Sequence, residues 1–327
     1  MQKQYTARMT TREKVMGSIE GVLAKPEFVT INTERLAEMA AEMKDAAVPP
    51  WDNDLQLLGT PEETAQYYFF LDSTNFCFWT TKSRARWEYQ VNGEWQKGYY
   101  AYSRALKDAY ERDPRMFDAN YLRAIPEEDF RAIFAQGRNE LLLMDERLAI
   151  IRENYGILAD KYEGSVLKLI EAADTDADKL VELLLDEFTT FRDTAEFEGE
   201  TVYLLKRPQI FCSDLYFTGL PELKLKNLEH LTIFADYKLP QLLEQFGALH
   251  YASELTKDIE TETLIPPGSQ KELELRASSI AAVEILREEM EKLGRSITSN
   301  ELDWILWVKA KQMAFAKPHH RTLTTFY

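Results

Sequence analysis

The sequence predicts a mainly α-helical protein, and three observations lead to this prediction. Capping boxes and prolines suited to a first helical turn precede several apolar runs with helical spacing. Only two stretches have the alternating or turn-rich character of strands. No window approaches the roughly 18 uninterrupted apolar residues of a membrane-spanning helix. We expect a single compact helical domain over residues 1–327 with a small β-hairpin, and we assign no element to residues 1–50.

The predicted helices begin at recognisable signals. Thr-Pro-Glu-Glu at 60–63 is a capping box with proline at the first helical position, and it opens a helix that reaches residue 71. Ile-Pro-Glu-Glu at 125–128 opens a second helix, which carries three apolar side chains on one side: Phe130, Ile133 and Phe134. Helical spacing predicts a third helix over 141–155, which Gly156 is expected to end. The same spacing predicts helices over 176–188, 269–293 (ended by Gly294) and 299–313.

Two stretches predict strands instead. Residues 86–97 alternate aromatic and polar side chains around Asn92-Gly93, a pair that favours a two-residue hairpin turn. Residues 200–206 favour one further strand. The segment Ile-Pro-Pro-Gly at 265–268 leads directly into another capping box, so we interpret it as a loop between helices rather than as a domain boundary.

The composition excludes several classes of function. The chain has 39 basic and 55 acidic residues, so its net charge is −16. A general nucleic-acid or anionic-membrane binder needs a broad basic face, although a few local cations can still hold a small anionic ligand. Cys77 and Cys212 have no metal-ligand spacing, and we expect both to be buried thiols of a cytoplasmic protein. Residues 1–11 contain no apolar signal-peptide region.

The segment 235–241, Ala-Asp-Tyr-Lys-Leu-Pro-Gln, places an acid, a phenol and an ammonium group side by side. Pro240 suits the first turn of a new helix, so Asp236 is expected beside unpaired backbone N–H groups at the positive end of a helix dipole. A carboxylate held there stays ionised, which suits it to stabilising a cation or directing a water. The alternative interpretation is that Asp236 is an ordinary helix cap.

An aromatic run at 75–79, Asn-Phe-Cys-Phe-Trp, follows the first predicted helix. Such a run usually belongs to the hydrophobic core. The functional alternative is that Phe78 or Trp79 stacks on a planar ligand while the Asn75 amide binds the polar edge of that ligand.

Residues 204–214 combine Lys206-Arg207-Pro208 with an acid among apolar neighbours. Pro208 favours the start of a helix, which would put Asp214 about two turns along it. A carboxyl group in such surroundings needs a partner or a function. Asp214 is therefore either one half of a salt bridge or a ligand-binding group.

The C-terminal residues 317–327 place His319 and His320 next to Arg321. Adjacent histidines suggest metal ligands, but no further ligand pattern completes a metal site, and we expect none. A phosphate-binding cluster fits better, because arginine offers phosphate a bidentate fork and histidine a charge-assisted bond. The alternative is an exposed basic tail.

Together these segments resemble the queuosine salvage protein family, the queuosine 5′-phosphate N-glycosylases. Two motifs stand out: Asn-Phe-x-Phe-Trp at 75–79 and Ala-Asp-Tyr-Lys-x-Pro-Gln at 235–241. Further matches lie in the same order along the chain, at 98–100, 191–193 with 197–199 and 206–207, Glu274-x-Arg276, 302–307, and 320–327. The resemblance runs from about residue 60 to the end, whereas the first 50 residues match poorly. One departure is Lys238 where arginine is common in the family, which replaces a fork with a point charge.

The resemblance implies a helical fold similar to helix-hairpin-helix DNA glycosylases and hydrolysis of queuosine 5′-monophosphate to queuine and ribose 5-phosphate. Asp236 is the implied catalytic residue, either stabilising the oxocarbenium ion or directing water. The base would contact Asp214, Asn75, Phe78, Trp79 and Tyr237. The phosphate would contact Lys238, Arg207, His320 and Arg321. We expect a monomer that uses no cofactor and binds a small nucleotide, not a nucleic acid or a membrane.

Two competing interpretations stay open. In the first, the chain is a non-catalytic helical nucleotide-binding module whose motifs are core and caps. In the second, it is an N-glycosidase for a related deazaguanine nucleoside or nucleotide. A 7-deazapurine has carbon in place of N7, so an enzyme that cleaves its N-glycosidic bond cannot use the usual protonation of that atom. Departure of the base must be assisted at another atom, or the ribosyl cation must be stabilised more strongly.

Overall fold

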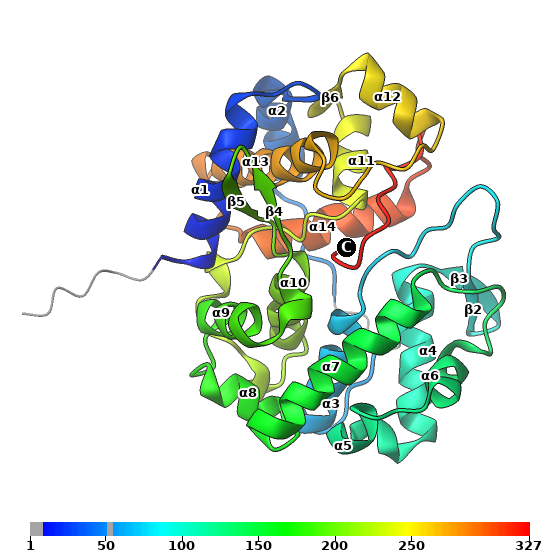
Figure 1. The fold of residues 1–327 in the computed structure, drawn as a ribbon. Coiled ribbons are helices and arrows are strands. Elements are labelled where there is room, and N and C mark those ends of the chain that lie inside the picture. The colour runs from blue at the N-terminus through cyan, green and yellow to red at the C-terminus, as the bar shows by residue number, and fades with distance from the viewer. Residues whose placement is uncertain (1–8, 51–54) are drawn as a thin grey trace, which may run out of the picture.

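The computed structural model describes residues 9–50 and 55–327 (Figure 1). Within these residues the chain forms fourteen α-helices and six short strands, so the prediction of a mainly helical protein is confirmed. Among the described helices, none has both the length and the apolar character needed to cross a membrane.

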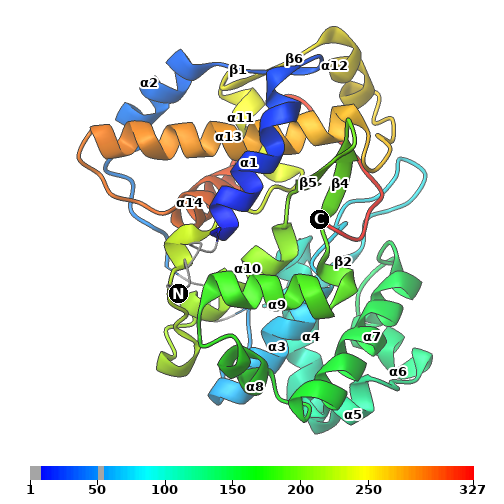
Figure 2. The ribbon, with the colours of Figure 1, turned by 60° about the vertical axis from the view of Figure 1, so that its left-hand side comes forward.

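The helices gather in two halves that both ribbon views show, one above the other (Figures 1 and 2). The lower half contains the middle of the chain: α3 (Pro61–Ser73), α4 (Tyr99–Arg112), α5 (Ala119–Leu122), α6 (Glu127–Phe134), α7 (Met144–Tyr162), α8 (Val166–Ala172), α9 (Ala177–Glu187) and α10 (Lys206–Phe217). The upper half contains both ends of the chain: α1 (Thr11–Ala24), α2 (Thr33–Met43), α11 (Lys238–Gln245), α12 (Ser253–Glu260), α13 (Gln270–Lys292) and α14 (Ser299–Gln312). One cluster of buried apolar side chains extends through both halves.

The N-terminal region, to which the sequence assigned no element, is part of this core. Helices α1 and α2 both pack against α13, with Val15, Ile19 and Leu36 fully buried. The strand β1 (Val29–Ile31) pairs antiparallel with β6 (Leu249–Tyr251), which joins this region to the last third of the chain.

Most predicted helix starts are confirmed. Thr60 accepts a hydrogen bond from the amide of Glu63, and the Glu63 carboxylate accepts from the amide of Thr60, so the capping box of α3 is complete. The buried side of α6 carries the three predicted apolar residues. Helices α9, α13 and α14 fall within the predicted ranges, and Gly294 follows α13 with a positive φ of 85°.

Three details of the helix prediction are wrong. Helix α7 begins at Met144, three residues after the predicted start, because Leu143 adopts a left-handed conformation. Helix α7 continues through Gly156 to Tyr162, because Leu158 and Tyr162 extend its buried side by another turn. The C-cap residue is Glu163, which adopts a left-handed conformation, and the amide of the next residue, Gly164, donates to the carbonyl oxygen of Leu158. The predicted capping box of α13 does not form either, since Ser269 makes no capping bond and its partner carboxylate binds the amide of Gly268.

The hairpin at 86–97 is confirmed as β2 (Glu88–Val91) paired with β3 (Glu94–Lys97) around the predicted Asn-Gly turn. The strand predicted at 200–206 is β5 (Glu200–Tyr203), and it pairs with β4 (Thr194–Phe197), which was not predicted. It is shorter than expected because α10 already begins at Lys206. The described residues thus contain three two-stranded sheets, not one hairpin.

Candidate active site

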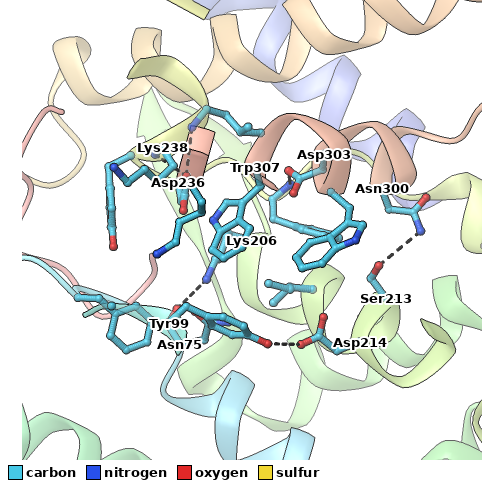
Figure 3. A pocket seen from close by; sticks show the side chains of 18 of the residues that line it. Asn75, Tyr99, Lys206, Ser213, Asp214, Asp236, Lys238, Asn300, Asp303 and Trp307 are labelled. Atoms are coloured by element: carbon cyan, nitrogen blue, oxygen red, sulfur yellow. Dashed lines mark hydrogen bonds between the residues drawn. The ribbon is translucent and has the colours of Figure 1, made fainter. Parts of the chain in front are cut away.

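A polar pocket lies between the two halves of the molecule (Figure 3). Its lower wall comes from the segment after α3, from the start of α4 and from α10. Its upper wall comes from residues 234–239 and from one side of α14. Four basic side chains (Arg86, Lys206, Lys238 and Lys311) and three acidic ones (Asp214, Asp236 and Asp303) line it.

Asp236 lies in this pocket at the N-terminus of α11, where the sequence placed it. Its Oδ1 atom accepts hydrogen bonds from the amides of Lys238 (2.6 Å) and Leu239 (3.4 Å). The helix begins two residues before Pro240, and Tyr237 rather than Asp236 occupies the N-cap position. The carboxyl group remains partly accessible from the pocket. The Asp236 carboxylate is therefore fixed by two helix amides and can be contacted by a ligand in the pocket.

Opposing influences set the pKa of Asp236. Burial raises it above the ordinary value for aspartate, while Lys206 and the two helix amides act in the opposite direction. The net shift of the pKa is upward, opposite to the direction that the helix terminus alone would give. Among the influences that lower this pKa, the ammonium group of Lys206 is the largest.

Lys206 lies in the middle of the pocket, between Asp236 and Asp214 (Figure 3). Its Nζ atom donates to the carbonyl oxygen of Asn75 at 2.7 Å. Burial lowers the pKa of Lys206 to about 8, against the raising influence of Asp236 and Asp72. Lys206 is also the first residue of α10, at the positive end of that helix, and the surrounding carboxylates compensate its charge.

A buried ion pair holds Lys206 and Asp236 in their places. The guanidinium group of Arg276 binds both carboxylate oxygens of Asp193, at 2.9 and 2.5 Å, and both side chains are fully buried. Arg276 also donates from Nε to the carbonyl of Ala235, next to Asp236. Asp193 in turn accepts from the amide of Lys206 at 2.9 Å. One ion pair thus ties the lower wall of the pocket to its upper wall.

Asp214 lies on the lower wall, about two turns along α10 as predicted. It accepts a hydrogen bond from the hydroxyl group of Tyr99 at 3.3 Å and forms no salt bridge within the described residues. Burial and the nearby Asp72 carboxyl hold the pKa of Asp214 well above its ordinary value. Asp303, on α14, is likewise buried, and its pKa is raised well above the usual range.

The other residues predicted to bind the base divide into two groups. Asn75, Phe78 and Tyr237 line the pocket, although the Asn75 amide already donates to Asp72 at 3.0 Å. Trp79 does not line it. Its ring is buried in a small cluster that includes Tyr237, and the guanidinium carbon of Arg321 lies 5.6 Å from its centroid.

Of the four residues predicted to bind phosphate, only Lys238 lines the pocket. Arg207 is fully buried and donates to the carbonyl oxygens of Ser73 and Thr190. His320 is buried against the Tyr327 hydroxyl, and burial lowers the pKa of its imidazole to about 3. Arg321 donates to Thr80 and forms an ion pair with Glu262 at 2.7 Å. The guanidinium groups serve the fold because buried carbonyl oxygens need donors.

Helix α14 supplies site residues to which the sequence analysis gave no role. Trp304 and Trp307 stack on each other with ring centroids 5.4 Å apart, and both line the pocket. Asn300 donates weakly to Ser213 at 3.5 Å, and its Oδ1 atom is buried without a hydrogen-bond partner among the described residues. The motif at 302–307 spans three of the α14 lining residues (Asp303, Trp304 and Trp307), so the signal was present without an assigned function.

Comparison with known proteins agrees with this geometry. A family model described as queuosine salvage protein matches residues 55–327, which include every residue of the pocket. The chain belongs to the queuosine salvage protein family. The resemblance inferred from the sequence motifs is therefore confirmed.

Several relatives in the family carry the name queuosine 5′-phosphate N-glycosylase/hydrolase. The protein of Sphaerobacter thermophilus is 36% identical over 318 residues, which cover 96% of this chain and 97% of that one. The Dictyostelium discoideum protein is 36% identical over 269 residues (81% and 79%), and the Mus musculus protein is 32% identical over 321 residues (94% of each). The bacterial and mouse similarities extend over nearly the whole chain, so they include part of the N-terminal region that the motifs did not cover.

Proposed function

We propose that this protein hydrolyses the N-glycosidic bond of queuosine 5′-monophosphate, releasing queuine and ribose 5-phosphate. The observation that carries the proposal is the position of Asp236: a carboxylate held by helix amides that lines a pocket together with aromatic rings and several cations. The names of the relatives supply the substrate, since each is called a queuosine 5′-phosphate N-glycosylase/hydrolase.

Asp236 is the proposed catalytic residue. Breaking an N-glycosidic bond builds positive charge on the ribose, and a fixed carboxylate near the anomeric carbon lowers the energy of that transition state. The two amides of α11 fix the direction of the carboxylate, and Lys206 favours its ionised form. The same oxygen atoms can orient the water that attacks the ribosyl cation.

The lower wall and α14 are the proposed base site. The guanine-like edge of queuine carries N–H donors, for which the side-chain carboxyl group of Asp214 and the unpaired Oδ1 of Asn300 are acceptors. The rings of Phe78, Tyr237 and Trp307 supply flat apolar surface for the heterocycle. A raised pKa leaves Asp214 or Asp303 able to hold a proton, so either can also donate to an acceptor atom of the departing base other than position 7.

The remaining expectations follow from the same residues. We infer a monomeric enzyme that binds a small nucleotide. The continuous apolar cluster supports a single domain. A cytoplasmic location fits the two free, buried cysteines, Cys77 and Cys212.

The test is mass spectrometry of the purified protein after incubation with queuosine 5′-monophosphate and, separately, with queuosine. We expect free queuine mainly from the monophosphate. Equal release from the nucleoside would indicate an N-glycosidase of different specificity. Binding without release from either compound would reduce the protein to a nucleotide-binding module and overturn the proposal.

A further inference from the structure

Asp72 is a buried carboxyl group next to the lower wall of the pocket. It lies in the last turn of α3, is fully buried and does not itself line the pocket. The C-terminus of a helix is its negative end, and burial disfavours a charged carboxylate further. A carboxyl group in this position therefore needs contacts that offset both effects.

The Asp72 carboxyl group makes one hydrogen bond within residues 9–50 and 55–327, and its partner is a residue of the pocket. Oδ1 of Asp72 accepts from Nδ2 of Asn75 at 3.0 Å, whereas Oδ2 is buried without a partner in that part of the chain. An ionised carboxylate can only accept, so it binds the NH2 end of the Asn75 amide and leaves the carbonyl end free. Asn75 lines the pocket, and no hydrogen bond to its Oδ1 atom is found among the described residues. That oxygen atom is the acceptor that Asn75 can offer to a ligand.

The backbone around Asn75 is fixed without the help of Asp72. The carbonyl oxygens of four consecutive residues each accept a hydrogen bond from a buried cation: Ser73 from Arg207, Thr74 and Phe76 from Arg147, and Asn75 from Lys206. Figure 3 shows the contact between Lys206 and Asn75. Buried carbonyl oxygens need donors, so these contacts hold the main chain of residues 73–76 in place. The Asn75 side chain is then the part of this segment whose direction depends on Asp72.

The charge of Asp72 also acts on two ionisable groups of the pocket. Burial lowers the pKa of Lys206 and raises that of Asp214, and the Asp72 carboxylate opposes the first shift and adds to the second. Burial raises the pKa of Asp72 itself to about 7, against its hydrogen bond to Asn75 and the charges of Lys206 and Arg207. The other ionisable groups that face it are Cys212 of α10, Tyr67 of α3 and Tyr99 of α4.

We propose that Asp72 is a positioning residue of the base site, which directs the Oδ1 atom of Asn75 toward an N–H group of the bound base. The inference rests on the proposed function for the identity of the ligand, and it adds a direction to one contact. Queuine carries N–H donors on its guanine-like edge, so Asn75 joins Asp214 and Asn300 as an acceptor. A base that presented a carbonyl oxygen to Asn75 would place two acceptors face to face, and such a mismatch is rejected. Asp72 thus selects the ligand without touching it.

The test is a double-mutant cycle of Asp72→Asn and Asn75→Ala, measured by calorimetric titration with free queuine at pH 8. Asp72→Asn keeps the shape of the side chain but can donate as well as accept, so it no longer dictates the direction of the Asn75 amide. Each single variant should weaken queuine binding about threefold to tenfold, the effect of one hydrogen bond. The double variant should weaken it no further than Asn75→Ala alone.

Two controls accompany the cycle. Binding of ribose 5-phosphate should stay within about twofold in all three variants, because that fragment has no base. Asp178→Asn is the matched control, since Asp178 is a hydrogen-bonded aspartate that does not line the pocket. It should leave queuine binding unchanged.

Additive losses in the double variant would show that Asp72 acts independently of Asn75 and would overturn the proposal, as would full queuine affinity in Asp72→Asn. Failure of the proposed function gives a different result. If the unaltered protein releases no queuine from the monophosphate but binds queuine, the cycle still decides the role of Asp72. Absence of queuine binding in the unaltered protein would overturn that role.

The pH dependence of queuine binding keeps the test decisive if Asp72→Asn does not fold. Asp72 is ionised above its pKa of about 7 and neutral below it, so queuine should bind the unaltered protein about threefold more weakly at pH 6 than at pH 8. Asn75→Ala has no amide to direct, so its affinity for queuine should be the same at both pH values. Equal pH dependence in the two proteins would overturn the proposal, because an effect through Lys206 or Asp214 would appear in both.

Discussion

The two ends of the pocket differ in how the protein compensates their ionisable side chains. At the acidic end, Asp214 and Asp303 are satisfied by the protein itself, through the Tyr99 hydroxyl group and the amide of Phe234. At the basic end, Arg86 and Lys311 are left without any carboxylate among the described residues. The difference is that the acidic side chains already have hydrogen-bond donors in the free protein, whereas these two basic side chains have no carboxylate that compensates their charge. Asp236 stands between them and belongs to neither.

The largest effect is expected when the residue between the two ends, Asp236, loses its charge. Asp236→Asn keeps the shape of the side chain and removes the charge, so kcat for queuosine 5′-monophosphate should fall by about a thousandfold or more, while the dissociation constant changes less than about threefold. Stopped assays for queuine and calorimetric titration measure the two quantities. A variant that still turns over within about tenfold of the unaltered protein would remove Asp236 from the mechanism.

The second change removes the ion pair that joins the two walls. Arg276→Met leaves the Asp193 carboxylate buried without its partner, so the free energy of unfolding should fall by about 3–4 kcal/mol in urea denaturation. Lys292→Met, on the same helix and in an exposed ion pair, should leave stability unchanged. Equal stability of the two variants would show that the pair does not hold the walls together.

Arg207 is a useful contrast to the cations of the pocket, because it is a buried cation that does not line the pocket. Arg207→Met leaves the carbonyl oxygens of Ser73 and Thr190 without a donor, which should lower the free energy of unfolding by about 2 kcal/mol. The preference for monophosphate over nucleoside, measured as a ratio of kcat/KM values, should stay the same. A selective loss of activity on the monophosphate would instead return Arg207 to the phosphate contacts.

The smallest expected effect comes from pH. The charge of Lys311 is present below its pKa of about 8 and is lost above it, with Arg86 and Lys238 as the charges that face it. The kcat/KM ratio of monophosphate to nucleoside should therefore fall about threefold to fivefold between pH 7 and pH 9. Lys311→Arg keeps the charge over this range, so its ratio should stay flat. An identical pH profile in both proteins would assign the change to another group.

Local signals predicted the parts of this molecule that local physics decides. The capping box at Thr60 and the Asn-Gly turn need only neighbouring residues, and both formed as expected. Asp236 and Asp214 also reached the pocket, because their positions depend on where α11 and α10 begin. The similarity to helix-hairpin-helix DNA glycosylases stays a prediction.

Tertiary contacts decided the rest. The sequence of a motif is the same whether the guanidinium group of its arginine faces a ligand or a buried carbonyl oxygen. Arg207 and Arg321 were therefore predicted to bind the phosphate, although both donate to backbone carbonyl oxygens. Arg86 and Lys311 line the pocket but come from distant segments, and no local signal pointed to them. The strand β4 was not predicted for a related reason, because only its pairing with β5 makes it a strand.

The walls of the pocket come from opposite halves of the molecule, and this arrangement has a consequence for heat resistance. A nucleotide that contacts Asp214 below and Lys311 above acts as a removable, non-covalent cross-link between the halves. Occupancy then adds to the free energy of unfolding by mass action, about 2.7 kcal/mol at a hundredfold excess of ligand over Kd. The melting temperature thus becomes a measure of which fragment, base or ribose phosphate, holds the halves together.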